Sequence, residues 1–378
     1  MTTTLEKPRR AKTPAGITLA TEALRRAMAT VKAAVGGNNR PTLANVRIGD
    51  GVAEATDLEL RISCEIEYTG EPILLPYQRL SAILASGRDE QVTLSPTGTS
   101  CEIVMGRIGS QRKSSWTLPT EAVAEFPAWT PSEIERRAIC RIPADQFCRA
   151  VRAVTYAVDN DSSRYALGAV LVEVKDGTAT FVATDGRRLS RYDVEIDQAV
   201  DDSTTLWPSR AIGVLASLAS HSECAVQLES AGNELVATID TAVVVSRTID
   251  GRFPKWRDVI PERDAKATSV NAREMLSAVR QAAIVTSEQS KGVLFVFTAE
   301  GIDLTARSSE AGESSVTCAV LEPGQPASVK LDPHYVADFL RHVDEGEPVQ
   351  IEAVNAQSAV VLRSGDCTGV IMPLSEDA

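Results

Sequence analysis

The chain of 378 residues repeats one ordered set of landmarks three times, and this repetition constrains its fold more than any other feature. An acidic residue followed by glycine stands between two strand-like runs at Asp50-Gly51, Asp176-Gly177 and Glu300-Gly301, at intervals of about 125 residues. Because glycine accepts positive φ, such dipeptides make tight hairpin turns. The sequence therefore predicts three hairpins at a nearly constant interval, which is typical of an internally repeated fold.

Three further landmarks follow each turn in a constant order. A related string comes first, as ATDLEL at 55–60, ATDGRRL at 183–189 and LTARSSE at 304–310. A proline then opens a helix-like segment, in LPYQRLSAILAS from Leu75, WPSRAIGVLASL from Trp207 and LDPHYVADFLRH from Leu331. An alternating strand comes last, as VTLS at 92–95, VQLE at 226–229 and VQIE at 349–352. This shared order favours triplication over coincidence.

Each unit also begins with an amphipathic helix. Apolar residues recur at helical spacing in the first two units, at Leu24, Met28, Val31 and Val35 and at Phe147, Val151, Val154 and Val158. The third unit repeats the pattern in NAREMLSAVRQAAIV.

We therefore predict an α+β fold of three domains, each built from two βαβββ halves with the helices on one face of the sheet. The predicted parts of the chain are a flexible basic tail at 1–16 and domains at 17–134, 135–264 and 265–378.

The composition excludes several classes of protein. Apolar residues make up 43% and charged residues 24% of the chain, and no apolar stretch approaches the roughly 18 residues of a membrane helix. The N-terminus lacks a secretory h-region, so we expect a cytoplasmic protein without membrane contact. The seven cysteines form no CxxC pair and only three histidines occur, so we expect reduced thiols, no metal site and no cofactor.

A net charge of -12 argues against a protein that wraps tightly around nucleic acid. Repeated domains more often build an extended or closed surface. A unit of about 120 residues has a diameter of about 35 Å, and six such units in a ring leave a hole of similar width. Two chains of three units would therefore form a homodimeric ring that admits a DNA duplex, with helices lining the hole.

Arginines lie off the apolar stripe of the predicted helices and would face this hole. They are Arg26, Arg79, Arg149, Arg152, Arg210 and Arg280. For any single arginine, an ordinary solvated helix face is an equally good explanation. As a set, they would present positive charge to phosphates while acidic residues face outward.

Four segments together resemble the bacterial DNA polymerase III beta sliding clamp family. They are RYALGAVLVEV from Arg164, ATDGRRLS at 183–190, IDGRFPKWRDVIP at 249–261 and VIMPL at 370–374. The resemblance implies a ring-shaped homodimer that encircles duplex DNA without sequence specificity and tethers the replicative polymerase. It also implies a subunit with no catalytic residues, which an ATP-dependent clamp loader opens.

The resemblance further implies that partners insert a short peptide into a pocket between the second and third domains. These partners are the DNA polymerase III alpha subunit and other proteins with a clamp-binding motif. The implied pocket residues are Leu167, Thr184, Gly186, Arg187, Arg188, Leu189, Pro254, Val259, Tyr335, Val370, Ile371, Met372, Pro373 and Leu374. Core packing is the alternative explanation for the Val, Ile, Met and Leu members.

Two smaller sites follow. Arg40, in the loop NNRPTL, resembles a DNA-contacting arginine of the family, although a plain connector explains this loop equally well. Ile284 and Val285 end the first helix of the third unit, and we expect them at the dimer interface, where sheet edges would have to pair.

Parts of the sequence also suggest three other functions. A phosphodiesterase would use Asp57, Asp185 and Asp303 as metal ligands, but these occur once per repeat and so should not converge on one ion. A clamp-fold paralogue with altered partners and a monomeric interaction scaffold remain open, and the sequence does not decide between them.

The chain departs from the family at the rim of the implied pocket. Asp258 stands near a usual cation, Ser290 replaces a bulky residue, and SEDA at 375–378 replaces a basic and apolar ending. Arg187 replaces a common histidine.

Because a rim acid repels an acidic peptide, we predict that Asp258→Arg raises affinity for acidic partner peptides by roughly fivefold, the scale of one exposed charge pair. A fluorescence titration of one acidic peptide against both proteins measures this change. Equal affinities would contradict the prediction.

Overall fold

The structure is a computed structural model that describes residues 16–37, 40–106, 113–127, 135–159, 165–196, 201–261, 265–287, 292–344 and 346–375. The chain divides into two compact units. One consists of Met1–Glu135 with Val236–Ser246, and the other of Arg136–Leu235 with Arg247–Ala378. The predicted tail at 1–16 lies almost entirely outside the described residues.

The order strand, helix, strand, strand, strand occurs six times, twice in each repeat. The first repeat contains β1 (Ile17–Ala20), α1 (Thr21–Val31), β2 (Asn45–Gly49), β3 (Val52–Thr56), β4 (Leu60–Glu65), β5 (Ile73–Pro76), α2 (Tyr77–Ala85), β6 (Gln91–Thr97), β7 (Ser100–Gly106) and β8 (Lys113–Pro119). The second contains β9 (Arg137–Pro143), α3 (Ala144–Thr155), β10 (Ala169–Lys175), β11 (Thr178–Thr184), β12 (Arg188–Glu195), β13 (Ser203–Pro208), α4 (Ser209–Ala219), β14 (Ala225–Ala231), β15 (Glu234–Ile239) and β16 (Ala242–Arg247). The third contains β17 (Thr268–Asn271), α5 (Ala272–Ala282), β18 (Val293–Phe297), β19 (Ile302–Ser308), β20 (Gly312–Cys318), β21 (Ala327–Leu331), α6 (Pro333–His342), β22 (Pro348–Glu352), β23 (Val360–Ser364) and β24 (Cys367–Ile371). The predicted α+β class and the two βαβββ halves per repeat are confirmed.

The two halves of each repeat exchange their first strands. β1 pairs with β6 of the other half, and β5 pairs with β2. The second repeat does the same with β9 beside β14 and β13 beside β10, and the third with β17 beside β22 and β21 beside β18. All these pairings are antiparallel, so backbone hydrogen bonds hold the two halves of every repeat together.

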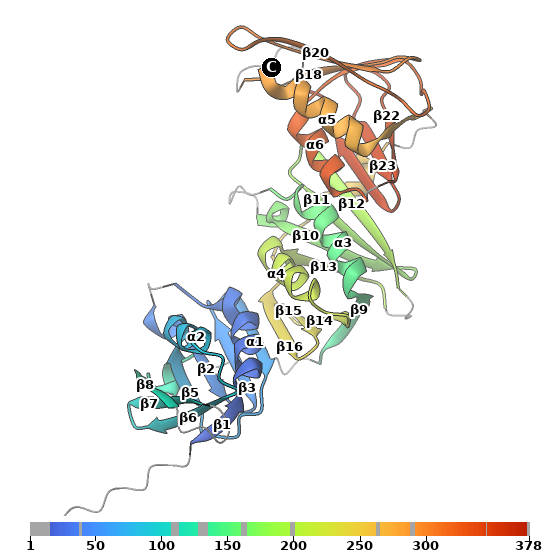
Figure 1. Cartoon of the computed structure of the whole chain (residues 1–378). Coiled ribbons are helices and arrows are strands. Elements are labelled where there is room, and N and C mark those ends of the chain that lie inside the picture. The colour runs from blue at the N-terminus through green and yellow to red at the C-terminus, as the bar shows by residue number, and fades with distance from the viewer. Residues whose placement is uncertain are drawn as a thin grey trace, which may run out of the picture. The chain divides into compact units, whose positions relative to one another are not determined.

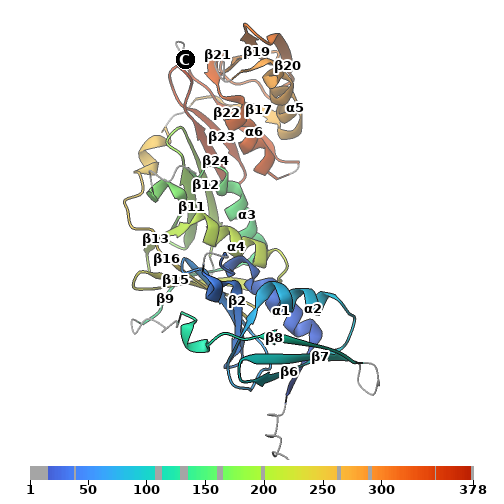
Figure 2. The ribbon, with the colours of Figure 1, turned by 90° about the vertical axis from the view of Figure 1, so that its left-hand side faces the viewer.

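The last strands of the halves join sheets of different repeats. In the first unit β4 pairs with β16, and in the second unit β12 pairs with β24. Figures 1 and 2 show the second pairing, where a strand of the second repeat lies beside a strand of the third. Residues 236–246 therefore pack with the first repeat. The predicted domain boundaries at 135 and 265 stay predictions.

Two sheets of four strands end in a last strand whose outer edge is open in the described part of the chain. Their orders are β1-β6-β7-β8 and β20-β19-β18-β21, so the open last strands are β8 and β20.

Hairpin turns form at the predicted dipeptides. Asp50 and Gly51 have φ of 52° and 77°, and Asp176 and Gly177 have φ of 49° and 77°, as a two-residue turn between twisted strands requires. The third turn is built differently, because the Thr298 hydroxyl accepts hydrogen bonds from the amides of Glu300 and Gly301.

The paired helices of each repeat cover one face of its sheets (Figures 1 and 2). The apolar residues predicted for the first helices of the first two repeats are buried except Val35, which is half-buried. Phe147 of α3 packs edge-on against Phe181 of β11 with ring centroids 6.0 Å apart. The α-helices end earlier than predicted, at Val31 and Thr155, because the chain tightens into turns with hydrogen bonds three residues apart, as in the 3-10 helix Lys32–Ala34 and from the Val158 amide to the Thr155 carbonyl. No helix in the described ranges is long and apolar enough to cross a membrane.

Candidate functional site

A short turn between β11 and β12 carries several of the predicted pocket residues. The Thr184 hydroxyl donates to the Arg188 carbonyl at 2.6 Å and accepts from the Gly186 amide at 3.1 Å. The Asp185 carboxylate accepts from the amides of Arg187 and Arg188, both at 2.9 Å. Gly186 has φ of 86°, which a side chain would strain. The turn is therefore fixed by its own side chains.

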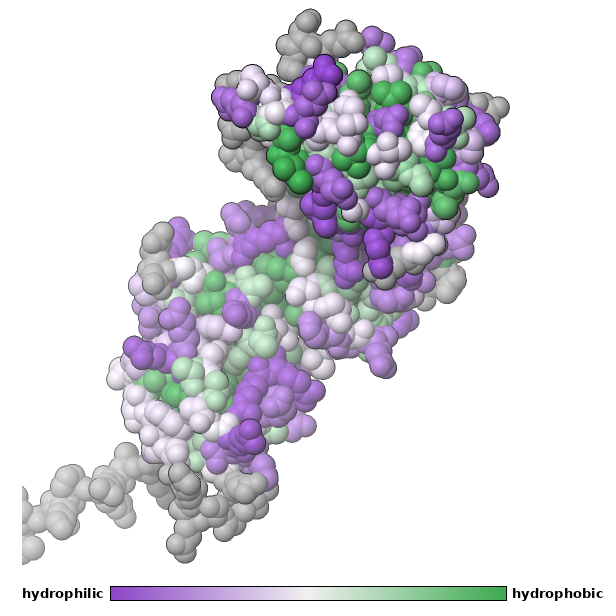
Figure 3. All heavy atoms as spheres, turned by 45° about the horizontal axis from the view of Figure 1, so that its top comes forward, coloured by the Kyte–Doolittle hydropathy of each residue, from purple (hydrophilic) through white to green (hydrophobic). Residues whose placement is uncertain are grey.

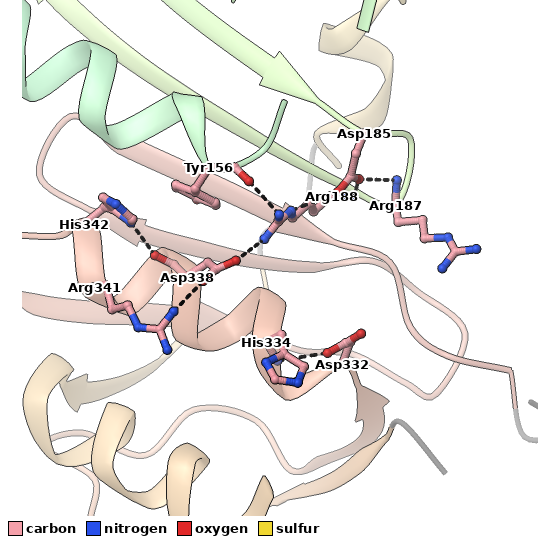
Figure 4. Close-up of polar contacts among 9 residues, drawn as sticks. All are labelled: Tyr156, Asp185, Arg187, Arg188, Asp332, His334, Asp338, Arg341 and His342. Carbon is pink, nitrogen blue, oxygen red and sulfur yellow. Dashed lines mark hydrogen bonds and ion pairs between the residues drawn. The ribbon is translucent and has the colours of Figure 1, made fainter. Parts of the chain in front are cut away.

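Arg188 connects this turn to the third repeat (Figure 4). Its guanidinium donates to Asp185 at 3.0 Å, to Asp338 of α6 at 2.6 Å and to the Tyr156 carbonyl at 2.5 Å. The same group lies 4.5 Å from the ring centroid of Tyr335 and 5.3 Å from that of Tyr156. Burial lowers the pKa of Arg188, but the two carboxylates outweigh burial and raise it. Arg188 thus stays charged and satisfies each of its nitrogen groups.

Asp338 also pairs with a second arginine, which lies on the same helix. Arg341 donates to the other carboxylate oxygen at 2.7 Å, and the His342 ring nitrogen lies 2.7 Å from the Asp338 carbonyl. The His342 ring stacks on Tyr156 with centroids 5.0 Å apart. Asp332 caps the start of α6 by accepting from the His334 amide at 2.9 Å (Figure 4). These contacts fix α6 against the end of α3.

The pairing of β12 with β24 brings the C-terminal segment to the same turn. Leu189 lies opposite Val370, and the Met372 amide donates to the Arg187 carbonyl at 2.9 Å. The Leu374 amide donates to the Lys330 carbonyl of β21, also at 2.9 Å. The predicted segment 370–374 therefore runs from the turn to the third repeat.

An apolar cluster lies on the sheet face opposite the helices and forms a floor beside the turn. It contains Ala169, Leu171, Val182, Leu189, Leu206, Trp256 and Val370. Ile371 does not belong to it, because successive strand residues alternate and its side chain enters the helix-side core of the third repeat. Ile371 is thus a core residue, which is the alternative explanation given for the apolar residues of the implied pocket.

The segment after β16 covers this floor. The guanidinium groups of Arg191 and Arg257 both contact the Trp256 ring, at 5.2 and 4.1 Å from its centroid. A hydrogen bond from Arg257 lowers the pKa of Glu173. Pro254 and Val259 of this segment are exposed.

Pro254 also lines a hollow of about 750 Å³, together with residues of β13 and of the apolar floor. The buried Leu167 lies in the 3-10 turn Tyr165–Gly168. A side chain at Gly251 would come within 3.0 Å of Ala166 in this turn, which places Leu167 close to the covering segment. The predicted pocket residues thus belong to the turn, the C-terminal segment, this segment and nearby elements, and several are buried. That they form one binding pocket stays a prediction.

Sequence reasoning missed the partners of the predicted residues. Asp338 and Tyr156 hold Arg188, but neither carries a motif that indicates the contact. Trp256 belongs to the segment IDGRFPKWRDVIP at 249–261, one of the four that carry the family resemblance, and this segment could have indicated it.

All seven predicted DNA-facing arginines are exposed. Arg149 pairs with Asp145 one helical turn away at 2.9 Å. The surface drawn in Figure 3 mixes hydrophilic, intermediate and apolar residues. That these arginines face DNA stays a prediction.

The two predicted interface residues differ in their surroundings. Ile284 is 77% exposed, whereas Val285 packs against the core of the third repeat. Ile284 lines a hollow of about 300 Å³ on α5 with Leu276 and Arg280. Ile284 is thus exposed and Val285 only partly buried, and their place at a dimer interface stays a prediction.

The three aspartates of the phosphodiesterase alternative serve their own repeats. Asp57 and Asp185 accept backbone amides within turns, and Asp303 accepts from the Thr317 hydroxyl at 2.6 Å. Ser290 and the last residues of SEDA lie outside the described residues.

Two family models match this chain. One describes the central domain of the DNA polymerase III beta subunit and matches residues 141–255, and the other describes its C-terminal domain and matches residues 257–375. The chain belongs to the DNA polymerase III beta-subunit family.

Curated relatives and solved structures agree with this assignment. The beta sliding clamp of Chlamydia pneumoniae is 25% identical over 332 residues, which cover 85% of this chain and 87% of that protein. The beta sliding clamp of Escherichia coli K12 is 25% identical over 379 residues, covering 94% and 99%. The fold matches the Bacillus subtilis sliding clamp with a TM-score of 0.86 at 19% identity, covering 96% and 99% of the two chains. It matches a Pseudomonas aeruginosa clamp with a TM-score of 0.85 at 23% identity, covering 96% and 100%.

Removing Arg188 should destabilise this junction far more than removing its exposed counterpart. We predict that Arg188→Ala lowers the free energy of unfolding by about 3 kcal/mol, because the partly buried carboxylates of Asp185 and Asp338 both lose the arginine that joins them and the Tyr156 carbonyl loses its donor. The control Arg341→Ala removes a more exposed pair and should cost about 0.5 kcal/mol. Urea denaturation compares the two, and equal losses would contradict the role given to Arg188.

Proposed function

We propose that this member of the beta-subunit family is a DNA sliding clamp, a non-catalytic processivity factor that encircles duplex DNA. Its partners are a second copy of the chain, the clamp loader, the DNA polymerase III alpha subunit and other proteins with a clamp-binding motif. The observation that carries this proposal is the pair of open sheet edges at β8 and β20.

The strand pairing within the chain supports closure by a second copy. Each half ends in a last strand, and four of these six are used in the pairs β4–β16 and β12–β24. β20 is built like β12, because Ser190 donates to the Ala153 carbonyl of α3 at 2.7 Å and Ser314 donates to the Ala282 carbonyl of α5 at 2.8 Å. The outer edge of β20 can therefore pair with another strand, which the described part of this chain does not supply.

β8 occupies the place in its half that β24 occupies in the third repeat. The two pairs of strands have the same register. Val360 of β23 lies opposite Ile371 of β24, and Cys101 of β7, which corresponds to Val360, lies opposite Leu118 of β8. If β20 of one copy pairs with β8 of another, two such junctions form and the ring closes with two-fold symmetry. Ile284 follows α5 in a short turn that contacts β20, so it would lie beside the junction.

A threaded ring resolves the conflict between DNA binding and a net charge of -12. Topological linkage needs no tight contact, and exposed helix arginines give a solvated positive lining along which the ring slides. The turn at Thr184–Arg188 and the segment 370–374 then form the site for an anchoring apolar residue of a partner peptide.

The register of β12 with β24 predicts the register between copies. Arg188 lies opposite Ile371, so Gly312 should lie opposite Leu118 and Ser315 opposite Ser115 of the partner. We predict that the double variant Ser115→Cys, Ser315→Cys forms an intersubunit disulfide, since opposite residues lie about 5 Å apart. Denaturing electrophoresis without reductant detects the product.

The matched control Ser115→Cys, Glu313→Cys is displaced by two residues and should remain uncrosslinked. Efficient crosslinking of the control, or none of the register pair, would contradict the proposed junction.

Retention on DNA should depend on topology rather than on salt. We predict that the loaded protein stays on closed circular duplex DNA at high salt and is lost once the circle is linearised, because threading is insensitive to ionic screening. Gel filtration of labelled protein with both DNA forms measures retention. Equal loss from circles and linear DNA at high salt would refute encirclement.

A further inference from the structure

The turn that carries the proposed pocket occurs a second time, in the first repeat, with the same hydrogen bonds. The Thr56 hydroxyl donates to the Leu60 carbonyl at 3.0 Å and accepts from the Leu58 amide at 3.1 Å. The Asp57 carboxylate accepts from the amides of Glu59 and Leu60 at 3.1 and 2.9 Å. Thr56 and Thr184 are therefore equivalent, and the strands around them can be compared residue by residue.

The comparison identifies an exchange of apolar for charged side chains. In the second repeat Leu171 lies opposite Val182, and Leu189 lies opposite both Thr184 and Val370. In the first repeat Arg47 lies opposite Glu54, and Arg61 lies opposite both Thr56 and Val245. Arg47, Glu54 and Arg61 thus occupy the positions of Leu171, Val182 and Leu189.

These three charged residues form one ion-pair cluster. The two carboxylate oxygens of Glu54 lie 3.5 Å from Arg47 and 2.7 Å from Arg61. Glu54 is only 9% exposed and Arg61 only 8%. Their equivalents in the second repeat are apolar residues of the floor beside the proposed pocket.

Arg61 also fixes the segment that covers this face. It donates to the Pro127 carbonyl at 2.5 Å, and its guanidinium lies 5.7 Å from the Phe126 ring centroid. The string FP recurs at Phe253-Pro254, where Phe253 packs on the apolar floor instead. A charged side chain therefore holds the cover in the first repeat.

The turns differ in one further respect. Leu58 has φ of 82° and is 45% exposed at the position where Gly186 has no side chain. The first-repeat turn thus carries an exposed apolar side chain where the second-repeat turn carries none.

We propose that the first-repeat face is a closed copy of the partner pocket, and that the cluster Arg47, Glu54 and Arg61 restricts partner peptides to one site per chain. This inference rests on the proposed function. An anchoring Leu or Phe gains free energy when it is buried against an apolar floor. Against the ion-pair cluster it would have to displace buried charges from their partners, which is strongly unfavourable.

The test converts the closed face into the open one. The triple variant Arg47→Leu, Glu54→Val, Arg61→Leu carries the residues of the second repeat, and the probe is a synthetic peptide with a Leu-Phe anchor. Calorimetric titration should give one peptide per wild-type chain and two per triple-variant chain. The matched control Glu54→Gln breaks the ion pairs without an apolar floor, so it should lower the melting temperature and still bind one peptide.

A folded triple variant that binds one peptide, or a wild-type chain that binds two, would overturn this inference but leave the proposed function intact. A wild-type chain that binds none would refute the proposed pocket itself. If the triple variant does not fold, a photoreactive form of the peptide can be crosslinked to the wild-type chain, and the labelled residues then show where the peptide binds. Labelling confined to the second and third repeats supports the inference, and labelling of residues 47–61 overturns it.

Discussion

Backbone pairing between the last strands of the βαβββ halves is the constraint on which this structure depends. A strand at a sheet edge exposes amides and carbonyls that require partners. The chain meets this requirement within itself at β4–β16 and at β12–β24. The three repeats contain six halves, and the last strands of four of them pair within the chain. The last strands of the other two halves, β8 and β20, each end a sheet of four strands, so their outer edges are open in the described part of the chain.

The same pairing creates the proposed partner site. By placing β24 beside β12, it brings the chain's last strand to a turn near its middle, and Arg188 then joins that turn to α6 through Asp338. The first repeat shows that backbone geometry alone does not make such a site. An equivalent turn and strand pair carries Arg47, Glu54 and Arg61 there, so side-chain chemistry decides which copy is open.

Local patterns predicted most of the fold. The hairpin at Asp176-Gly177 and the stripe through Phe147 follow from turn chemistry and helical periodicity, both properties of neighbouring residues. The contact of Arg188 with Asp338 joins residues far apart in the chain, and no local pattern encodes it. The sequence alone does not predict which face of the sheet Ile371 occupies, because it does not fix the residue at which β24 begins. A shift of one residue along a strand moves every side chain to the opposite face.

The central claim is that a second copy pairs with the open edges and completes a ring. Native mass spectrometry at working concentration tests it directly, with Ser315→Pro as a variant that places an imino acid in the β20 edge. We expect about 81 kDa for the wild type, twice the chain mass of 40.5 kDa, and a shift toward the single-chain mass for the variant. A wild-type protein found only at the single-chain mass would contradict it.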